Sequence, residues 1–202
     1  MARIPLPTSE DMSPEQRHVH DAVVAGPRGQ MIGPLRAVIH SPELAARWSS
    51  LGEFLRFGTC LPKRSSELAI AVTGRRWSSQ VEWWVHARAA AEAGIPQAAL
   101  DAIQQGDAPV FDEADDTLVH DFTRELLLTG QAPPILYDAV RDRWGARGVV
   151  ELTALIGYYT MVSMTLNAHE IPLPDGVAPV LAPPESGLAP LSPARTAARV
   201  AE

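Results

Sequence analysis

The sequence predicts an all-α protein, folded as a compact bundle of helices. Two helix starts are marked by a serine, a proline and an acid in succession, at Ser13-Pro14-Glu15 and Ser41-Pro42-Glu43. Serine favours the N-cap position and proline the first helical position. Apolar residues then recur at three- and four-residue spacing, as on one face of a helix. No run of alternating β-branched residues flanked by turn residues indicates a strand.

The N-terminal third is expected to contain an irregular arm, a helix, a loop and a second helix. Residues 1–13 form the arm, and the first helix runs from Pro14 to about Ala25. The segment 26–34 contains three glycines and two prolines, which predicts a loop. A helix follows from Pro42 and ends at Gly58. Its predicted buried stripe has helical spacing and consists of Leu44, Trp48, Leu51 and Leu55.

The next helix, which begins at Leu61-Pro62, is apolar nearly all round and carries Glu67. Such a helix lies deep in a core. A glutamate on it must be paired or hydrogen-bonded, or its pKa must rise.

Four more helices are predicted after Gly94, over about 96–105, 112–129, 133–144 and 147–168. The last is apolar on every side, which indicates a central helix or one pressed against another subunit. Residues 171–202 are rich in proline and alanine, and we expect a tail that is mobile or lies on a neighbouring subunit. The predicted organisation is therefore an arm (1–13), a helical domain (14–170) and a tail (171–202).

Composition limits the classes of function. The net charge of −7 without a basic cluster argues against nucleic-acid binding. No apolar run of transmembrane length and no signal peptide are recognised, so no membrane association is expected. A single cysteine, Cys60, excludes an internal disulfide and makes a reducing cytoplasm the simplest location.

The chemistry is concentrated between Glu67 and Gly94. If a helix begins near Ser79, then Ser79, Glu82 and His86 share one face, because residues three, four or seven apart lie on the same side. The helix before it can fold back antiparallel and aim Glu67 at the same place. An imidazole and two carboxyls at the margin of a core can be tuned toward neutral pKa values by burial and mutual charge.

These residues resemble the signature of the carboxymuconolactone decarboxylase and alkylhydroperoxidase-D superfamily. That pattern is an acid on one helix, then C-x-x-C-x-x-x-H near the start of the next, then small residues ending in glycine. Here it reads Glu67, then SQVEWWVH over 79–86, then AAAEAG over 89–94. Both cysteines are absent, and Glu82 with His86 matches the E-x-x-x-H of the decarboxylase branch. The resemblance covers about residues 30–170.

The resemblance implies an alkylhydroperoxidase-D-like bundle that forms a homo-oligomer, a trimer or hexamer, and that uses no cofactor or metal. It implies a lyase-type decarboxylation or isomerisation of a small oxygenated ring or lactone compound, in aromatic-compound catabolism. The family's counterpart of the 26–34 loop borders the substrate pocket, so Met31 and Ile32 are expected to line it. Ser79 and Trp83 are the other expected substrate contacts.

In the expected mechanism His86 moves a proton to or from the substrate. Glu82 fixes the tautomer of His86, and Glu67 with backbone donors holds the polar end of the substrate. Three arginines are candidates for binding an anionic substrate: Arg64, Arg75 and Arg76.

Each of these residues also has a purely structural interpretation. His86 can be a satisfied histidine at the core edge, Glu82 half of a surface i,i+4 pair, and Glu67 part of a salt bridge. Ser79 can be an N-cap, and Trp83 a core or interface residue. Two other functions stay open: an alkylhydroperoxidase-type peroxidase, disfavoured by the missing thiols, and a non-catalytic oligomeric binding protein.

Overall fold

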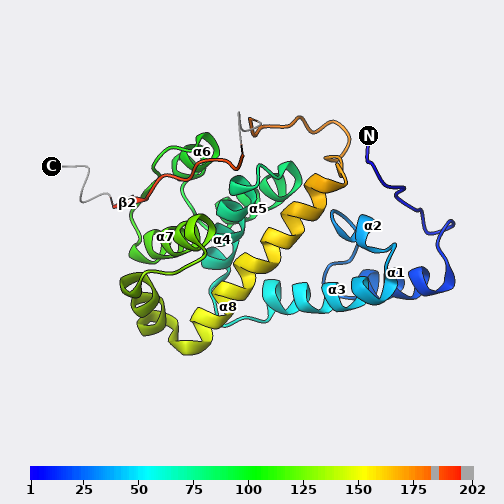
Figure 1. The fold of residues 1–202 in the computed structure, drawn as a ribbon, viewed down its shortest axis with the longest axis horizontal. Helices are drawn as coiled ribbons and strands as arrows, with labels where there is room; N and C mark the ends of the chain where they lie inside the picture. Colours follow the sequence, from blue (N-terminus) through cyan, green and yellow to red (C-terminus); the bar gives the residue numbers. More distant parts are fainter. Residues whose placement is uncertain (183–186, 197–202) are drawn as a thin grey trace.

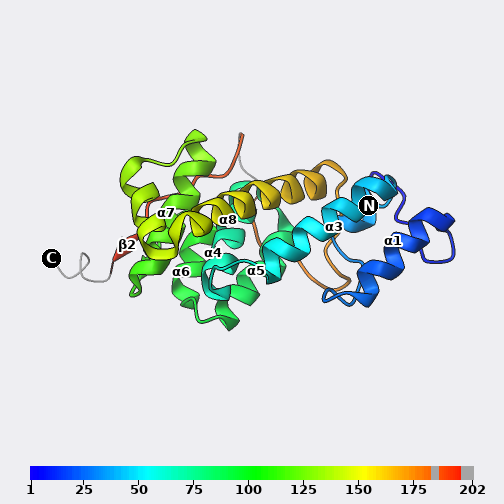
Figure 2. The ribbon, with the colours of Figure 1, turned by 90° about the horizontal axis from the view of Figure 1, so that it is seen from below.

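The structure is a computed structural model that describes residues 1–182 and 187–196. Over these residues the chain is mostly helical, and the all-α prediction is confirmed. The elements are α1 (Pro14–Ala25), α2 (Leu35–Val38), α3 (Pro42–Phe57), α4 (Lys63–Arg76), α5 (Gln80–Glu92), α6 (Gln97–Gln105), β1 (Val110–Phe111), α7 (Ala114–Thr129), α8 (Pro134–Ala168) and β2 (Arg195–Thr196). Figure 1 and Figure 2 place α1 and α3 at one end of an elongated molecule and α6 and α7 at the other.

The two strands were not predicted. β1 and β2 pair in parallel through two residues each, with Val110 opposite Arg195 and Phe111 opposite Thr196. Two residues are too few to produce a recognisable alternation of apolar and polar side chains. The short helix α2 was not predicted either.

Helix α4 is the centre of the bundle, as its apolar sequence predicts. Every residue from Ser65 to Arg75 is buried, and the helix contacts α5, α7 and α8. Glu67 therefore lies within the protein, where a carboxylate needs partners.

Helix α8 crosses the middle of the molecule beside α4 (Figure 1). The predicted helices 133–144 and 147–168 are its two arms, separated at Gly145, whose φ of 72° and ψ of 178° are not helical. By length and composition α8 could cross a membrane, since an 18-residue window has a mean hydropathy of 1.4, although 56% of that window is buried inside the fold. The central helix of a bundle has the same properties.

Helix α3 buries a different stripe from the predicted one. Trp48 and Leu55 are buried as expected, but Leu44 and Leu51 are 50% and 48% exposed. The buried face is rotated toward Gly52, which contacts α8: a Cβ atom at Gly52 would lie 2.0 Å from the hydroxyl oxygen of Tyr158. This close approach, invisible in the periodicity of apolar residues, sets the orientation of α3.

The described part of the predicted C-terminal tail packs on its own chain. Leu181, Ala189 and Leu191 are buried. The Ala189 amide donates a hydrogen bond to the Arg76 carbonyl at 3.0 Å, an ordinary distance for a backbone hydrogen bond. Residues 183–186 and 197–202 of the predicted tail lie outside the described residues. The arm, residues 1–13, contains no helix or strand.

Candidate active site

Helices α4 and α5 bring together the three residues predicted to carry the chemistry. A turn with Ser78 at a φ of 48° reverses the chain between them. The helices approach closely at Gly74, where a Cβ atom would lie 3.1 Å from the Cβ of Glu82. Glu67, Glu82 and His86 are only 3%, 4% and 3% exposed. The structural alternative of a surface pair for Glu82 and His86 therefore does not describe this chain.

Glu67 binds the first nitrogen of His86. Its Oε2 atom lies 2.6 Å from Nδ1 of His86 in a buried hydrogen bond. Burial raises the pKa of Glu67, but the hydrogen bond and the charges of His86, Arg56 and Lys63 outweigh it, so that the pKa is lowered. An ionised Glu67 accepts a hydrogen bond from the Nδ1–H group, which leaves the lone pair of a neutral imidazole on Nε2. Glu67, and not Glu82 as expected, therefore sets the tautomer of His86.

Glu82 faces the second nitrogen. Its Oε2 atom lies 3.3 Å from Nε2 of His86, yet within the described residues it has no partner aligned for a hydrogen bond. Burial raises the pKa of Glu82 above the usual range for a carboxyl, and the negative charge of Glu67 adds to the effect. The two carboxyls on opposite sides of one imidazole therefore have pKa values shifted in opposite directions, down for Glu67 and up for Glu82.

Glu82 and His86 border a small hollow, here named the His86 hollow, of about 60 Å³. Two tyrosines of α8 form part of its wall. The ring of Tyr159 packs edge-on against the His86 ring at 5.0 Å, and the Tyr158 hydroxyl donates to the Trp48 carbonyl over 3.2 Å. Burial raises the pKa of Tyr158 to about 12 and also raises that of Tyr159. Both phenols are therefore neutral near pH 7.

The hollow adjoins a cleft of about 470 Å³, here named the arginine cleft because Arg28, Arg56 and Arg88 line it. Arg28 and Arg56 also line the His86 hollow, so the two spaces are neighbours. Nε of Arg56 lies 3.8 Å from Oε1 of Glu67. Sequence reasoning did not predict that these three arginines line one cleft. Only Arg28 had a signal, since it lies in the glycine- and proline-rich loop expected near the pocket.

The expected substrate contacts are distributed over several places. Ile32 lines both the His86 hollow and the arginine cleft. Met31 is half-buried against the apolar core and is not among the residues that line these two spaces. Ser79 and Trp83 line two other cavities, of about 550 and 370 Å³. Ser79 occupies the N-cap position of α5, but its hydroxyl makes no cap hydrogen bond and has no partner in the described chain.

The three arginines named in the sequence as anion-binding candidates are engaged elsewhere. Arg64 pairs with Asp116 at 2.6 Å, Nε of Arg75 donates to the Gln104 carbonyl at 2.7 Å, and Arg76 donates to the Ala189 carbonyl at 2.6 Å. Each joins α4 to another part of the fold. These contacts join parts of the fold, and none of the three arginines lines the His86 hollow or the arginine cleft.

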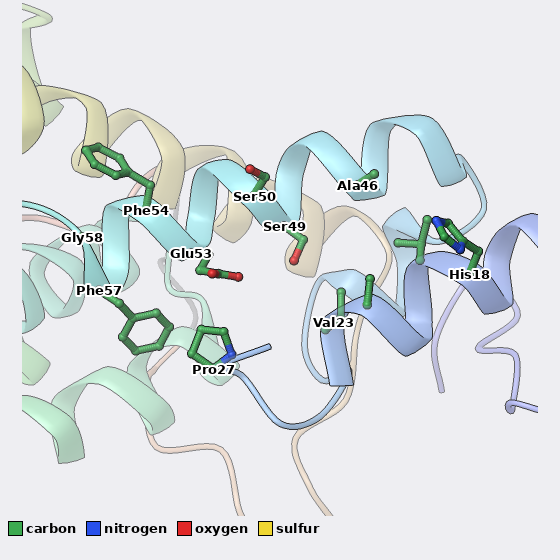
Figure 3. Close-up of a pocket in the computed structure, with 12 residues that line it drawn as sticks. His18, Val23, Pro27, Ala46, Ser49, Ser50, Glu53, Phe54, Phe57 and Gly58 are labelled. Atoms are coloured by element: carbon green, nitrogen blue, oxygen red, sulfur yellow. The ribbon is translucent and has the colours of Figure 1, made fainter. Parts of the chain in front are cut away.

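A further cavity, of about 610 Å³, lies between α1 and α3 (Figure 3). Phe57 and Pro27 lie together at one end of it, and His18 lies at the other. Its lining contains only His18 and Glu53 as titratable groups. Size alone would select this cavity, but the paired acid and base groups lie at the smaller His86 hollow.

Cys60 is not among the residues that line the His86 hollow. The sole cysteine, Cys60, precedes α4, and its amide donates to Oε2 of Glu151 over 2.6 Å. Burial and Glu151 raise the pKa of the Cys60 thiol, which disfavours the reactive thiolate. Within residues 1–182 and 187–196, no three histidine, cysteine, aspartate or glutamate side chains are arranged to hold a metal ion.

Comparisons with models of known families, with curated proteins and with solved structures gave no match to this chain. The family resemblance therefore depends on the residues between Glu67 and Gly94.

Proposed function

We propose that this protein is a cofactor-independent enzyme that moves a proton to or from a small oxygenated ring or lactone compound. The reaction class is a decarboxylation or isomerisation of the lyase type, as in the carboxymuconolactone decarboxylase family that the sequence resembles. One observation carries the proposal: His86 has an ionised carboxylate on Nδ1 and a carboxyl of raised pKa beside Nε2, at a hollow that borders an arginine-lined cleft.

In an isomerisation, Nε2 of His86 takes a proton from a carbon next to a carbonyl group, and the imidazolium or Glu82 returns a proton to another carbon. In a decarboxylation, the carboxylate leaves as carbon dioxide and its bonding electron pair remains on carbon. Glu82 or the imidazolium then delivers one proton to that carbon, and a proton from solvent restores the donor group. Glu67 stabilises the imidazolium in both cases without taking its proton.

The raised pKa of Glu82 supports a role in proton transfer near neutral pH. A general acid or base works best when its pKa lies near the working pH. Burial brings Glu82 toward that range, whereas an exposed glutamate stays ionised at neutral pH. The hydrogen bond to Glu67 holds the imidazole in one orientation, so Nε2 is directed at the hollow before substrate arrives.

The test compares three forms of the full chain: wild type, His86→Gln and His18→Gln. His18 is the matched control because it is an exposed histidine at the other cavity. A carboxylated muconolactone and small oxo acids are incubated in D₂O, and NMR follows product and deuterium incorporation. We expect His86→Gln to lose about 100-fold or more of the turnover, with helicity unchanged by circular dichroism, and His18→Gln to match the wild type.

Wild-type turnover in folded His86→Gln would exclude the histidine as the catalyst. The absence of product and of deuterium incorporation in the wild type, combined with ligand binding that depends on pH, would favour a non-catalytic binding protein. Consumption of a hydroperoxide in the presence of a thiol reductant would favour a peroxidase.

We also propose that the chain forms a cytoplasmic homo-oligomer, a trimer or hexamer as the resemblance implies. Exposed apolar side chains on α3 and α8 support an interface: Leu44, Leu51, Val150 and Met164 are 50%, 48%, 67% and 50% exposed. Sedimentation velocity measures the assembly, and a monomer at micromolar concentration would contradict this part of the proposal.

A further inference from the structure

The walls of the His86 hollow contain buried polar atoms that nothing in the described chain satisfies. They are Nε and Nη2 of Arg28, Nε of Arg56, Nε1 of Trp48 and Oε2 of Glu82. Native proteins rarely leave buried donors and acceptors unpaired, and a cluster of them at one cavity indicates a bound partner. The four groups come from the 26–34 loop, α3 and α5, so they converge from separate elements.

The unpaired atoms define the chemistry of that partner. Four of these atoms are N–H donors, and three of the four belong to the guanidinium groups of Arg28 and Arg56, which keep their charge. A ligand that satisfies them must offer several acceptor oxygens and carry negative charge. A carboxylate does both, and arginine forms its strongest directional hydrogen bonds with carboxylates and phosphates.

The size of the hollow separates the head of the ligand from its body. A volume of about 60 Å³ corresponds to roughly two water molecules at about 30 Å³ each. It accommodates a carboxylate group and excludes a whole ring. The arginine cleft beside it offers about 470 Å³, within the common range of ligand pockets of about 300–1,000 Å³.

Part of the cleft lining is apolar, beside Gln30, Glu92 and the three arginines. Ile32, Phe57 and Trp84 contribute large apolar side chains to its lining. The guanidinium carbon of Arg88 lies 5.1 Å from the centre of the Trp84 ring and fixes that ring in place. A flat or aliphatic ligand body is therefore favoured here over a strongly polar one.

We propose that the protein binds a carboxylic acid whose carboxylate enters the His86 hollow between Arg28 and Arg56 and whose apolar body lies against Trp84 in the arginine cleft. This inference names the substrate class of the proposed enzyme. It rests on the proposed function only in calling the ligand a substrate, since the binding of a carboxylate does not require catalysis. A carboxylate that leaves as carbon dioxide loses its charge, so arginines that bind it in the ground state slow its departure. The anchored group is therefore retained, and the proton moves at a neighbouring carbon.

Benzoate, a small flat carboxylate, is the probe, and uncharged benzamide is its isostere. Binding to the full chain is measured by titration calorimetry in wild type, Arg56→Gln, Arg56→Lys and Arg47→Gln. Arg47 is the matched control, an exposed arginine on the same helix that pairs with Glu43 at 2.6 Å. We expect benzoate to bind about tenfold or more tightly than benzamide, a preference that Arg56→Gln removes and Arg47→Gln preserves. Arg56→Lys should keep part of it, because lysine retains the charge without the planar fork.

Equal binding of benzoate and benzamide, or equal losses in Arg56→Gln and Arg47→Gln, would overturn the proposal. Competition by inorganic phosphate as strong as by benzoate would reduce the site to a simple anion site and overturn it too. The same titration in His86→Gln separates this proposal from the enzymatic one, since benzoate should still bind there. Benzoate binding in a wild type without turnover would refute the enzyme and leave the carboxylate site intact.

Discussion

Two ionic clusters lie three residues apart on α4, and they differ in how completely their hydrogen bonds are made. Arg64 holds Asp116 through both its Nε and Nη2 atoms, at 2.9, 3.1 and 2.6 Å, and its Nη1 donates to the Gly94 carbonyl at 2.5 Å. One turn further along, Glu67 binds His86, but Nε of Arg56 and Oε2 of Glu82 are left without partners among the described residues.

The difference separates a structural contact from a candidate site. In the cluster of Arg64 and Asp116 no buried side-chain atom lacks a partner among the described residues, and the cluster ties α4 to α7 and to the turn after α5. The cluster around His86 has unpaired atoms, carboxyls of opposite pKa direction and a cavity beside them. Perturbed ionisable groups in a cleft are typical of functional sites, whereas completed ion pairs are typical of scaffolds.

The largest expected effect tests the structural side of this comparison. Arg64→Met leaves the Asp116 carboxylate, 1% exposed, without its partner. We expect the free energy of unfolding to fall by about 3 kcal/mol, near the low end for a broken buried pair, since the Arg64 side chain is itself 30% exposed. Urea denaturation measures the loss. Arg47→Met, which removes an exposed pair, is the control, and a loss no larger than in that control would contradict the assignment.

The next effect tests whether Glu82 is protonated in the folded protein. Its pKa is raised above the ordinary 4.5, so the folded state binds the proton more tightly than the unfolded state. The contribution of Glu82 to wild-type stability must then fall as the pH rises from 4.5 through the raised pKa, and the loss is complete above it. Glu82→Gln lacks this titration. The variant should gain roughly 1 kcal/mol or more on the wild type between pH 4.5 and 8 in urea denaturation.

Parallel stability profiles for the two proteins would mean that Glu82 ionises as an exposed glutamate does. Glu67 does not titrate in this window, because its pKa is lowered below the ordinary 4.5 and it stays ionised between pH 4.5 and 8. The lowered pKa of Glu67 stabilises both at neutral pH and ceases to do so as the pH falls through it.

The sequence predicted the helices and the central triad for a common reason: both depend on short spacing. The positions of Glu82 and His86 follow from one turn of helix, and the short turn after Arg76 leaves Glu67 little choice but to face them. The prediction that Leu44 and Leu51 belong to the buried face of α3 was wrong. That face depends on the contact between Gly52 and Tyr158, two residues that are more than one hundred positions apart. Local periodicity contains no information on such a contact.

The arginine cleft was missed for the same reason. Arg28, Arg56 and Arg88 are on three separate elements, and no spacing rule relates them. Arg64, Arg75 and Arg76 were the natural choice from the sequence, since they lie beside the motif, but their hydrogen bonds are made with Asp116, Gln104 and Ala189. Nearness in sequence brought Glu67, Glu82 and His86 together, but it did not indicate which arginines line the cleft beside them.

The smallest expected effect on stability is that of removing Arg56, on α3, in comparison with Arg64, on α4. Arg56 is 25% exposed, and its Nε lies 3.8 Å from Glu67 without a hydrogen bond among the described residues. Its removal in Arg56→Gln should therefore cost less than about 1 kcal/mol of unfolding free energy, as for a weak, partly solvated ion pair. A loss as large as in Arg64→Met would make Arg56 a scaffold residue, and a fall in benzoate affinity would then report unfolding. A small loss together with the lost affinity means that Arg56 is held ready for a ligand's charge.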